Sequence, residues 1–483
     1  MVIIMWILGL SIVAVLVIYV FHWIIILTDP KFRNRSSLPP GSMGFPFIGE
    51  TFQFMIPSYS LDIHPFITKR IQRFGPIFRT SLFYQPIVIS TDREFNNYLI
   101  QQEGKLVELW AGPVSNMFQQ FGESEIFFGN IHKHIRSITL NHIGPERIRE
   151  KLIPLFEEMI LNTFHQWSTQ TSIDVKQSIT KMNFQFFAKF FFGYDIENLP
   201  RNTERISEEL FTNFTEGLKT IPLNIPGTNY HKCLEEWKKA IKIVKNILEA
   251  RRNSPEKYRG DILDQAINDL EKNKVMNDDQ IVFVILGIWF ASSASISSII
   301  QLIFKFLSDH PCVIEELRGE HEDILRSRDK SSSSLTWKEY KSMKFTQQVL
   351  NETLRFSTLL PGLLRIALKD IHFDEYVIPA NWIILISTPS LHMNSEIYKD
   401  PLTFNPGRWK ELDSLTVTKN FKPFGGGLAQ CPGAELTRAF IATFLHVLVT
   451  KYRWTKIKGG KVIRNPILGF KDEFHIKIWE NRE

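Results

Sequence analysis

The feature that most restricts the fold of this chain is a glycine-rich loop, residues 424–433. It contains one cysteine and leads directly into a largely apolar segment, residues 434–448. Three consecutive glycines, residues 425–427, allow positive φ angles and let the backbone approach a flat ligand closely. Cys431 lies just before the predicted helix, whose N-terminal dipole stabilises negative charge. The pattern therefore predicts a loop that presents a thiolate at the start of a helix.

A thiolate in this position can serve as the axial ligand of haem iron, where it favours cleavage of the O–O bond of dioxygen. The alternative is a buried structural cysteine in a glycine-rich turn, and the loop by itself does not separate the two. The chain has three cysteines, with no CxxC spacing, which speaks against a disulfide framework and against a structural zinc site. They are Cys233, Cys312 and Cys431.

The N-terminal segment, residues 1–27, contains no Asp, Glu, Lys or Arg. A helix of this length, at about 1.5 Å per residue, crosses a hydrocarbon core of roughly 30 Å. A cleaved signal peptide is the alternative, but its apolar region is shorter and follows basic residues. Here Lys31, Arg33 and Arg35 come after the apolar run, so the rest of the chain is expected in the cytosol. We therefore expect a membrane anchor.

After the anchor, the sequence predicts one large domain that is mainly α with a smaller β region. Residues 28–50 include a Pro/Gly-rich segment that cannot be helical and is expected to act as a hinge to the body, residues 51–483. Periodicity predicts an amphipathic helix at residues 65–74, and Thr336 with Glu339 forms a capping-box pattern that begins another. Expected strands lie within residues 77–82, 86–90 and 370–387.

Residues 281–304 are also free of formal charge, and their length would permit a second membrane span. Asp278 and Asp279 precede the segment, which suits the N-terminus of a helix. The middle of the segment is polar, so a buried central helix fits equally well. Its serines are Ser292, Ser293, Ser295, Ser297 and Ser298.

Three charged residues form a second pattern upstream of the glycine-rich loop. Glu352 and Arg355 are one turn apart on a predicted helix and can pair, and Arg408 lies on a Pro-bent segment further along. A buried carboxylate held by two guanidinium groups is a rigid, charge-paired arrangement. One Glu-x-x-Arg is common in helical proteins, but this set in this order before a cysteine loop is highly specific.

With these elements, the chain resembles the microsomal cytochrome P450 monooxygenases over essentially its whole length. The resemblance implies the cytochrome P450 fold and haem b as cofactor. By position, Cys431 matches the iron ligand, and Phe424 matches the aromatic residue that shields it. Gly427 and Gly433 match further cofactor-binding positions of the loop. Residues 281–304 match the long central helix that crosses the distal face of the haem, so they are not expected to span a membrane.

The resemblance also assigns the charged residues. His132, Arg136 and Arg365 match residues that reach the haem propionates. Glu352, Arg355 and Arg408 match the structural triad of the family.

Two positions depart from the family pattern. The family expects an arginine two residues before the iron ligand, where it binds a propionate, and here that residue is Ala429. Haem is therefore expected to bind less tightly. In the central helix the family expects an acid followed by Thr or Ser for proton delivery, and here Ala294 and Ser295 stand there, after Ala291. Proton delivery is then expected to depend on the hydroxyl and on water.

These departures leave three meanings open. Ordinary hydroxylation can persist through a chain of water molecules. The site can instead favour chemistry of an unprotonated iron-peroxo species, such as carbon–carbon cleavage beside a carbonyl. The third meaning is a weakly active or non-catalytic relative that binds haem or lipid. The isomerase-type relatives usually have a longer cysteine loop, and the ordinary separation of Phe424 and Cys431 argues against that activity.

In detail, the sequence is most similar to the plant clan that oxidises sterols, brassinosteroids and triterpenoids. A Met- and Phe-rich segment, residues 110–128, covers the pocket in such relatives and suits a rigid polycyclic substrate. An amphipathic helix that covers the core is the alternative for this segment. The residues that carry the likeness are 38–50, 141–142, 224–228, 230–232 and 450–454.

The resemblance finally implies a partner and a location. A microsomal enzyme of this type receives electrons from NADPH-cytochrome P450 reductase at the endoplasmic reticulum membrane. Lys419 and Lys422 precede the cysteine loop and are candidates for a basic docking surface. The net charge of +6 is mild and dispersed, so it fits an anionic membrane surface or an acidic partner and does not indicate nucleic acid. We therefore expect oxidation of a lipophilic sterol- or triterpenoid-like substrate by dioxygen.

Overall fold

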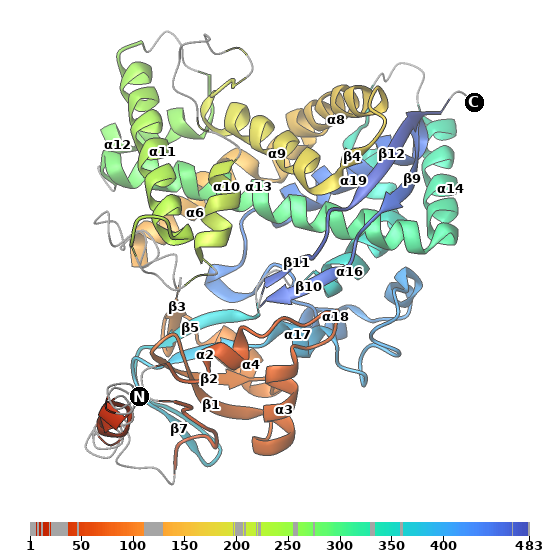
Figure 1. Cartoon of the computed structure of the whole chain (residues 1–483). Helices are drawn as coiled ribbons and strands as arrows, with labels where there is room; N and C mark the ends of the chain where they lie inside the picture. The colour runs from red at the N-terminus through yellow and green to blue at the C-terminus, as the bar shows by residue number, and fades with distance from the viewer. Residues whose placement is uncertain are drawn as a thin grey trace.

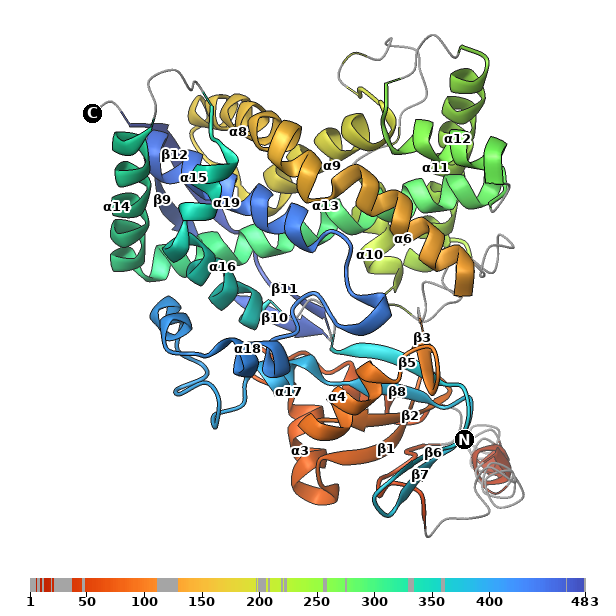
Figure 2. The ribbon, with the colours of Figure 1, turned by 180° about the vertical axis from the view of Figure 1, so that it is seen from behind.

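A computed structural model gives the arrangement of the chain (Figures 1 and 2). It describes residues 6, 9–10, 13–18, 20, 37–45, 48–110, 129–196, 198, 206, 209–218, 220, 224–254, 259–273, 276–328, 334–357, 361–465 and 467–481. Most of the expected anchor and all of residues 111–128 lie outside these ranges. The described residues of the anchor are helical, and their large apolar side chains are exposed.

A five-stranded sheet forms the lower layer of the molecule in Figure 1, with strand order β1-β2-β8-β5-β3. β2 and β8 are parallel, and the other pairings in this sheet are antiparallel. The strands expected at residues 77–82 and 86–90 are confirmed and pair as a hairpin. β2 begins one residue earlier than expected, because Phe83 and Tyr84 alone form the positive-φ turn. The strands are β1 Ile77–Leu82, β2 Gln85–Ser90, β3 Val107–Leu109, β5 Leu363–Ala367 and β8 Ile383–Ile386.

Three smaller sheets complete the β region among the described residues. One joins β4, β12 and β9, the second joins β10 and β11, and the third joins β6 and β7. Their bounds are β4 Ile173–Asp174, β6 Ile371–Phe373, β7 Tyr376–Ile378, β9 Tyr452–Lys458, β10 Val462–Asn465, β11 Ile467–Phe470 and β12 His475–Glu480.

Helices make up most of the remaining chain, and most of them lie in the upper part of the molecule in Figure 1, whereas α2, α3, α4, α17 and α18 lie beside the five-stranded sheet. The predicted mainly α architecture with a smaller β region is therefore confirmed. The first helices are α2 Thr51–Phe54, α3 Pro65–Phe74, α4 Arg93–Gln101, α6 Gly129–Ile143, α7 Pro145–Arg147, η4 Ile148–Leu152, α8 Ile153–Ser168, α9 Val175–Phe192, α10 Glu209–Leu218, α11 Asn229–Arg252 and α12 Ile262–Asn273. The later ones are α13 Asp278–Asp309, α14 Pro311–Ser327, α15 Trp337–Ser342, α16 Lys344–Phe356, α17 Thr388–His392, η6 Pro406–Lys410, α18 Ser414–Asn420, η7 Gly427–Ala429 and α19 Ala434–Lys451.

The charge-free segment in the middle of the chain is the long helix α13, which runs through the helical layer (Figure 2). It packs against α9, α11, α16 and α19. Trp289 is fully buried and donates its ring N–H to the carbonyl of Phe184 at 2.9 Å. Among the described residues, α13 is the one helix long and apolar enough to cross a membrane, and 50% of its most apolar window is buried. The prediction of a buried central helix is confirmed.

Two local predictions depend on helix ends. The helix predicted at residues 65–74 is α3, which begins at Pro65 and ends before Gly75, a residue with φ of 90°. The capping box is also present, since Thr336 and Glu339 each accept the other's backbone N–H at the start of α15. In both helices, residues at the helix ends determine where the helix begins or stops.

Candidate functional site

The cysteine loop, residues 424–433, is closed by one backbone hydrogen bond, from the N–H of Cys431 to the carbonyl of Phe424 at 2.9 Å. Gly425 and Gly427 have φ of 75° and 72°, in the left-handed region that glycine tolerates. Gly426 has extended backbone instead, so two of the three glycines use positive φ. The loop thus turns back on itself and delivers the cysteine next to the first residue of α19.

Cys431 is accessible to solvent at its surface. Many protein atoms nevertheless surround its thiol, so the thiol is partly removed from water. Desolvation raises the pKa of Cys431. A backbone N–H of Gly433 and the positive charge of Arg136 act in the opposite direction on the same pKa. The loop therefore offers an accessible sulfur beside a helix N-terminus, with a donor and a cation that favour the thiolate.

Glu352 lies at the centre of a buried charged cluster with Arg355 and Arg408. Its carboxylate accepts two hydrogen bonds from Arg355, at 3.0 and 2.8 Å, and one from Arg408 at 3.1 Å. Glu352 and Arg355 have fully buried side chains, and Arg408 is 7% exposed. The ring N–H of Trp409 donates a further bond at 3.0 Å, which the sequence pattern did not reveal. The structure thus brings the three triad residues together.

His392 joins this cluster to the segment that leads into the cysteine loop. Its Nδ1 atom lies 3.2 Å from the carbonyl oxygen of Arg355, and its Nε2 atom accepts the N–H of Lys422 at 3.0 Å. Burial, assisted by the charge of Arg355, lowers the pKa of His392 to about 3, so its ring is neutral. No motif singled out this histidine, because its role depends on three segments that meet only in the fold.

Two of the three residues expected at the propionates, Arg136 and Arg365, bond to carbonyls of the loop, and His132 lies near Arg136 and Glu103. Arg136 of α6 donates a hydrogen bond to the carbonyl of Gln430. Burial and the neighbouring Arg136 lower the pKa of His132. Arg365 of β5 is 2% exposed, and its Nε atom lies 3.1 Å from a carboxylate oxygen of Glu103. The three residues come from different elements, yet all lie beside the loop or share Glu103 as a charged neighbour.

Glu103 is a site residue that sequence reasoning missed. One oxygen of its carboxylate pairs with Arg365, and the other accepts the backbone N–H of Ala429 at 3.2 Å. Ala429 is the position where the family expects an arginine. A single glutamate shortly after α4 carries no recognisable signal in the sequence, so only the tertiary structure reveals this contact.

The middle of α13 presents small, accessible residues while its flanks are buried. Ala291 is exposed, and Ala294 and Ser295 are half-buried. Nothing lies within 4 Å of the place where a Cβ atom would stand at Gly287. These residues follow helical spacing, so they share one face, and a flat group can lie against that face without steric conflict. This observation fits a haem between α13 and an accessible cysteine.

Ser295 differs from the other serines in this part of α13. Ser292, Ser297 and Ser298 donate to carbonyls four residues back in the same helix. Ser293 donates to the carbonyl of Asn183. Within the described part of the chain, the Ser295 hydroxyl has no such partner. It therefore remains available to a ligand or to water on the accessible face of the helix.

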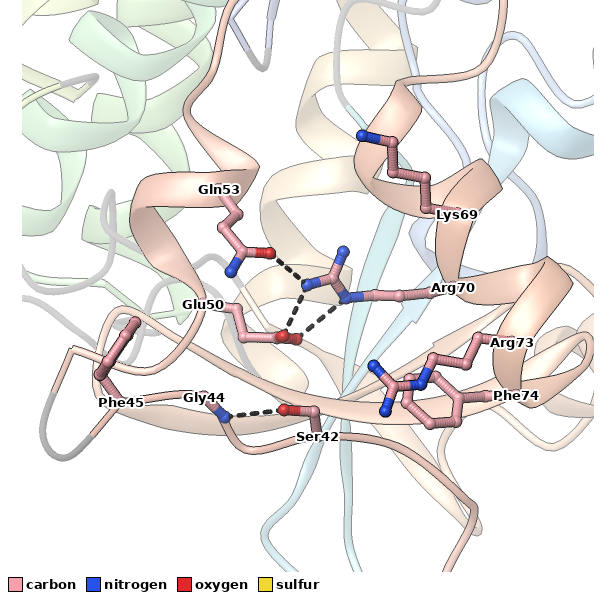
Figure 3. A pocket seen from close by; sticks show the side chains of 9 residues that line it. All are labelled: Ser42, Gly44, Phe45, Glu50, Gln53, Lys69, Arg70, Arg73 and Phe74. Atoms are coloured by element: carbon pink, nitrogen blue, oxygen red, sulfur yellow. Dashed lines mark hydrogen bonds and ion pairs between the residues drawn. The ribbon is translucent and has the colours of Figure 1, made fainter.

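A separate cavity of about 490 Å³ lies between the hinge, α2 and α3 (Figure 3). Three basic side chains of α3 line it. Arg70 extends toward Glu50 and Gln53 and Arg73 lies on the side of Ser42, whereas Lys69 ends at the top of the view. Arg70 is neutralised by Glu50 at 2.6 Å, which leaves the cavity with two more cations than anions. The lining residues are Ser42, Gly44, Phe45, Glu50, Gln53, Lys69, Arg70, Arg73 and Phe74.

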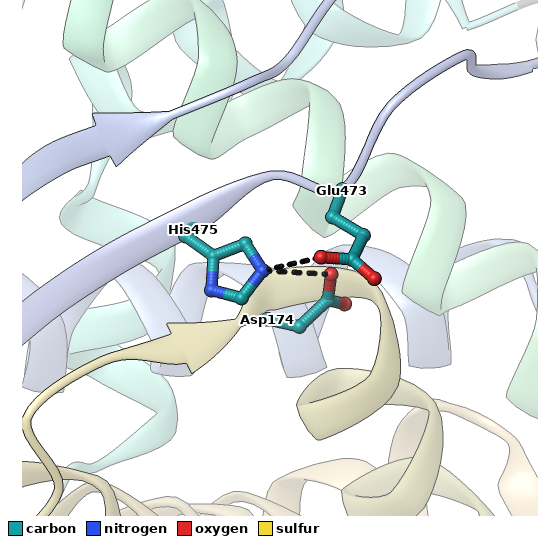
Figure 4. Close-up of side chains that lie close together, drawn as sticks. All are labelled: Asp174, Glu473 and His475. Atoms are coloured by element: carbon teal, nitrogen blue, oxygen red, sulfur yellow. Dashed lines mark hydrogen bonds and ion pairs between the residues drawn. The ribbon is translucent and has the colours of Figure 1, made fainter.

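One cluster of possible metal ligands occurs among the described residues, formed by Asp174, Glu473 and His475 (Figure 4). The imidazole Nε2 atom lies 2.9 Å from Glu473 and 3.8 Å from Asp174. Asp174 also caps α9 by accepting the N–H of Gln177. These groups are satisfied by one another and join β4 to β12, so we assign the cluster a structural role.

Comparison with known proteins agrees with this geometry. A family profile described as Cytochrome P450 matches residues 39–471. Cucurbitadienol 11-hydroxylase of Siraitia grosvenorii is 45% identical, over 98% of this chain and 99% of the relative. Beta-amyrin 16-alpha-hydroxylase CYP87D16 of Maesa lanceolata is 44% identical, over 98% and 99%. The structure of retinoic acid bound cyanobacterial CYP120A1 superposes with a TM-score of 0.79 at 24% identity, covering 92% of this chain and 100% of that chain, which shows similarity of fold.

Proposed function

Because this chain belongs to the cytochrome P450 family and is a haem-thiolate monooxygenase, we propose that it oxidises a lipophilic sterol- or triterpenoid-like substrate. The single observation that carries the proposal is the likeness, across nearly the full length of both chains, to hydroxylases named for cucurbitadienol and beta-amyrin. A cholesterol 22-monohydroxylase of Paris polyphylla, 32% identical over 92% of this chain, extends the likeness to sterols. This kinship favours catalysis over the non-catalytic alternative.

We assign Cys431 as the iron ligand, since it is the accessible cysteine at a helix N-terminus in a loop that glycine allows to turn back. Cys312 is also exposed, but it lies on α14 outside this loop, and Cys233 is buried. When bound, the haem supplies dioxygen activation, for which a thiolate ligand is the suitable electron donor. Phe424 is half-buried at the other end of the closing hydrogen bond, where it can shield the sulfur.

We assign His132, Arg136 and Arg365 to the haem propionates, with Gly427 and Gly433 giving the loop its close approach. Arg136 and Arg365 both reach the loop, since Arg136 donates to the carbonyl of Gln430 and Arg365 to the carbonyl of Gly426 at 3.5 Å. Arg136 is the stronger candidate, because the charge of Arg365 is already paired with Glu103. Burial and the neighbouring Arg136 lower the pKa of His132, so we assign it a hydrogen bond to a propionate. Without an arginine at position 429, the positive charge at the propionates comes from Arg136 and Arg365.

Ser295 is the residue we assign to proton delivery. Its hydroxyl has no carbonyl partner among the described residues, and it lies on the accessible face of α13 beside Ala294 and Ala291. A hydroxyl can pass a proton between water molecules, but it cannot supply one as a carboxylic acid does. Turnover is therefore expected to be limited by proton supply through water.

We further propose that residues 1–27 anchor the chain in the endoplasmic reticulum membrane, with the catalytic domain in the cytosol. The described residues of this segment are helical and carry exposed large apolar side chains. The hinge that follows borders the cavity with the surplus cations Lys69 and Arg73. Next to it, Phe45 and Phe52 are 68% and 64% exposed. Apolar side chains beside cations suit the surface of an anionic membrane.

NADPH-cytochrome P450 reductase is the proposed electron donor, with Lys419 and Lys422 in its docking surface. Lys419 is exposed. Lys422 is partly buried, and its ammonium group donates to the carbonyl of Thr418 at 2.5 Å. Reversing both charges should slow electron transfer and leave haem content intact. Unchanged reduction kinetics in that double variant would exclude this surface.

The first experiment is the carbon monoxide difference spectrum of the reduced protein in membranes, together with a Cys431→Ala variant. A thiolate-type Soret band in the native protein that is absent in the variant would establish Cys431 as the ligand. Incubation with reductase, NADPH and a panel of sterols and triterpenes then tests the substrate class. A native protein that shows the thiolate-type band but oxidises none of these compounds would contradict the proposed substrate class.

A further inference from the structure

Glu103 connects the five-stranded sheet to the cysteine loop through a single carboxylate. It lies two residues after the last residue of α4, and its side chain is 5% exposed. One oxygen is 3.1 Å from Nε of Arg365 in β5, and the other accepts the N–H of Ala429 at 3.2 Å. A buried carboxylate with an ion pair on one oxygen and a backbone N–H on the other is firmly oriented, because one partner is a cation and the other donates a hydrogen bond.

The loop itself contains no charged side chain, since residues 424–433 have neither Lys, Arg, Asp nor Glu. Ala429 offers only its backbone N–H where the family expects a guanidinium. Arg136 holds the loop from α6 through the carbonyl of Gln430, the next residue. Arg365 reaches the loop from β5 by donating to the carbonyl of Gly426 at 3.5 Å. Of the charged side chains that bond to the loop in the described structure, Glu103 is the acidic one, and it approaches from the end of α4.

The packing between Glu103 and the loop is close enough to exclude a side chain. A Cβ atom at Gly427 would lie 2.2 Å from a carboxylate oxygen of Glu103 and 2.9 Å from the carbonyl oxygen of Ile100. Gly427 also has positive φ, so a larger residue would be strained as well as crowded. The end of α4 and the loop therefore form a fitted contact that glycine makes possible.

We propose that Glu103 is a positioning residue for the cysteine loop. This inference rests on the proposed assignment of Cys431 as the haem ligand. Glu103 fixes the backbone two residues before the sulfur by accepting the N–H of Ala429, and this contact, not the ion pair with Arg365, carries the positioning. The alanine side chain at position 429 makes no polar contact, so the loop is held at this position by Glu103, a residue outside the loop.

Two variants separate the two contacts of Glu103. In Glu103→Gln the amide oxygen can still accept the N–H of Ala429, whereas the ion pair with Arg365 is lost. In Glu103→Ala both contacts are lost. Glu94→Ala is the matched control, because Glu94 is also an acidic residue of this segment but is exposed on α4.

The measurements are the thiolate-type fraction in the reduced carbon monoxide spectrum and the rate of haem transfer to excess apomyoglobin. We expect Glu103→Ala to lose much of the thiolate-type signal and to release haem about tenfold faster, since a hydrogen bond to a charged group is lost. Glu103→Gln should keep the thiolate-type signal, and Glu94→Ala should match the native protein. The signal kept by the glutamine variant separates loop positioning from a general effect on folding.

A native-like spectrum and release rate in Glu103→Ala would overturn the proposal, and so would equal loss of the thiolate-type signal in both Glu103 variants. If the variants fail to fold, hydrogen exchange of the native protein provides the test. The amide of Ala429 should be protected relative to exposed loop amides, and rapid exchange there would also overturn the proposal. A native protein that lacks the thiolate-type band would instead contradict the proposed function.

Discussion

The backbone N–H of Lys422 donates to Nε2 of His392 at 3.0 Å, which connects the segment before the cysteine loop to the buried triad. The opposite ring nitrogen of His392 lies 3.2 Å from the carbonyl of Arg355, so one neutral imidazole bridges two elements that are far apart in sequence. The triad is therefore connected to the segment before the loop through the backbone of Arg355 and Lys422.

We expect His392→Ala to lower the free energy of unfolding by about 1–3 kcal/mol, because the buried N–H of Lys422 loses its acceptor. Haem content after purification should fall with it, since the loop loses support. Chemical denaturation and the ratio of haem to protein measure both effects. His372→Ala is the control, because His372 is exposed on β6. Equal stability of the two variants would contradict the bridging role.

Arg408→Leu should destabilise the protein by about 3–5 kcal/mol, because it leaves a buried carboxylate with one fewer cation. The side chain of Glu352 is fully buried, so solvent cannot compensate for the loss. Thermal unfolding of the variant should start at clearly lower temperature, or the protein should be recovered without haem. A stable, haem-loaded Arg408→Leu protein would show that the triad is dispensable.

Ser295→Ala should lower product formation by about tenfold or more, because the side-chain hydroxyl next to the proposed oxygen site is removed. Haem content and substrate binding should stay unchanged, and spectral titration with a bound sterol or triterpene verifies this. Ser298→Ala is the matched control, since that hydroxyl already donates to the carbonyl of Ala294. Equal activity in both variants would place proton delivery elsewhere.

Ala294→Glu should raise the ratio of product formed to NADPH consumed, because a carboxylic acid can supply the proton that Ser295 must otherwise take from water. Peroxide release and product are measured together with reductase present. If the substitution leaves this ratio unchanged, proton supply does not limit the native enzyme.

Stability should fall on acidification below about pH 6.5, the pKa of an unfolded histidine. Burial lowers the pKa of His142, His392 and His446 to about 3 in the folded protein. These rings stay neutral when folded and take up protons only on unfolding, so the stability present above pH 6.5 is lost as the pH falls toward 3. Each contributes up to about 1.4 kcal/mol per pH unit in that window.

Denaturant unfolding at pH 7.5 and pH 5.5 measures this loss, and His446→Gln tests its origin. The variant should lose less stability than the native protein between the two pH values, because it carries one fewer buried imidazole. His165→Gln is the control, since His165 is largely exposed. The same pH dependence in His446→Gln as in the native protein would assign the effect to other groups.

Lys69→Gln combined with Arg73→Gln should reduce the preference of the protein for anionic over neutral vesicles by about 1 kcal/mol for each charge removed. Lys238→Gln with Lys242→Gln is a matched pair, because it has the same helical spacing on α11. Co-sedimentation at low and physiological salt measures the preference. Equal binding by the two double variants would show that Lys69 and Arg73 of the hinge cavity do not contact the anionic membrane.

The sequence by itself determined the features that depend on neighbouring residues. Pro65 and Gly75 set the ends of α3, and Thr336 with Glu339 starts α15, because helix termini are satisfied by side chains within a few positions. The cysteine loop was recognisable for the same reason, since its glycines and the following helix are contiguous. The overall fold followed from the order of such local elements together with the family resemblance.

Only the tertiary structure decided the contacts between distant segments. Glu103 and Ala429 are 326 positions apart, and nothing local to either residue predicts that they meet. Nothing local predicts the role of His392 either, which joins Arg355 of α16 to Lys422 in the segment before the loop. The charge-free segment α13 passes the composition test for a membrane span, and packing against α9 buries it instead. Hydrophobic periodicity and helix capping depend on residues a few positions apart, so they can be recognised in the sequence. Burial and ion pairing depend on which surfaces the folded chain brings together, so they cannot.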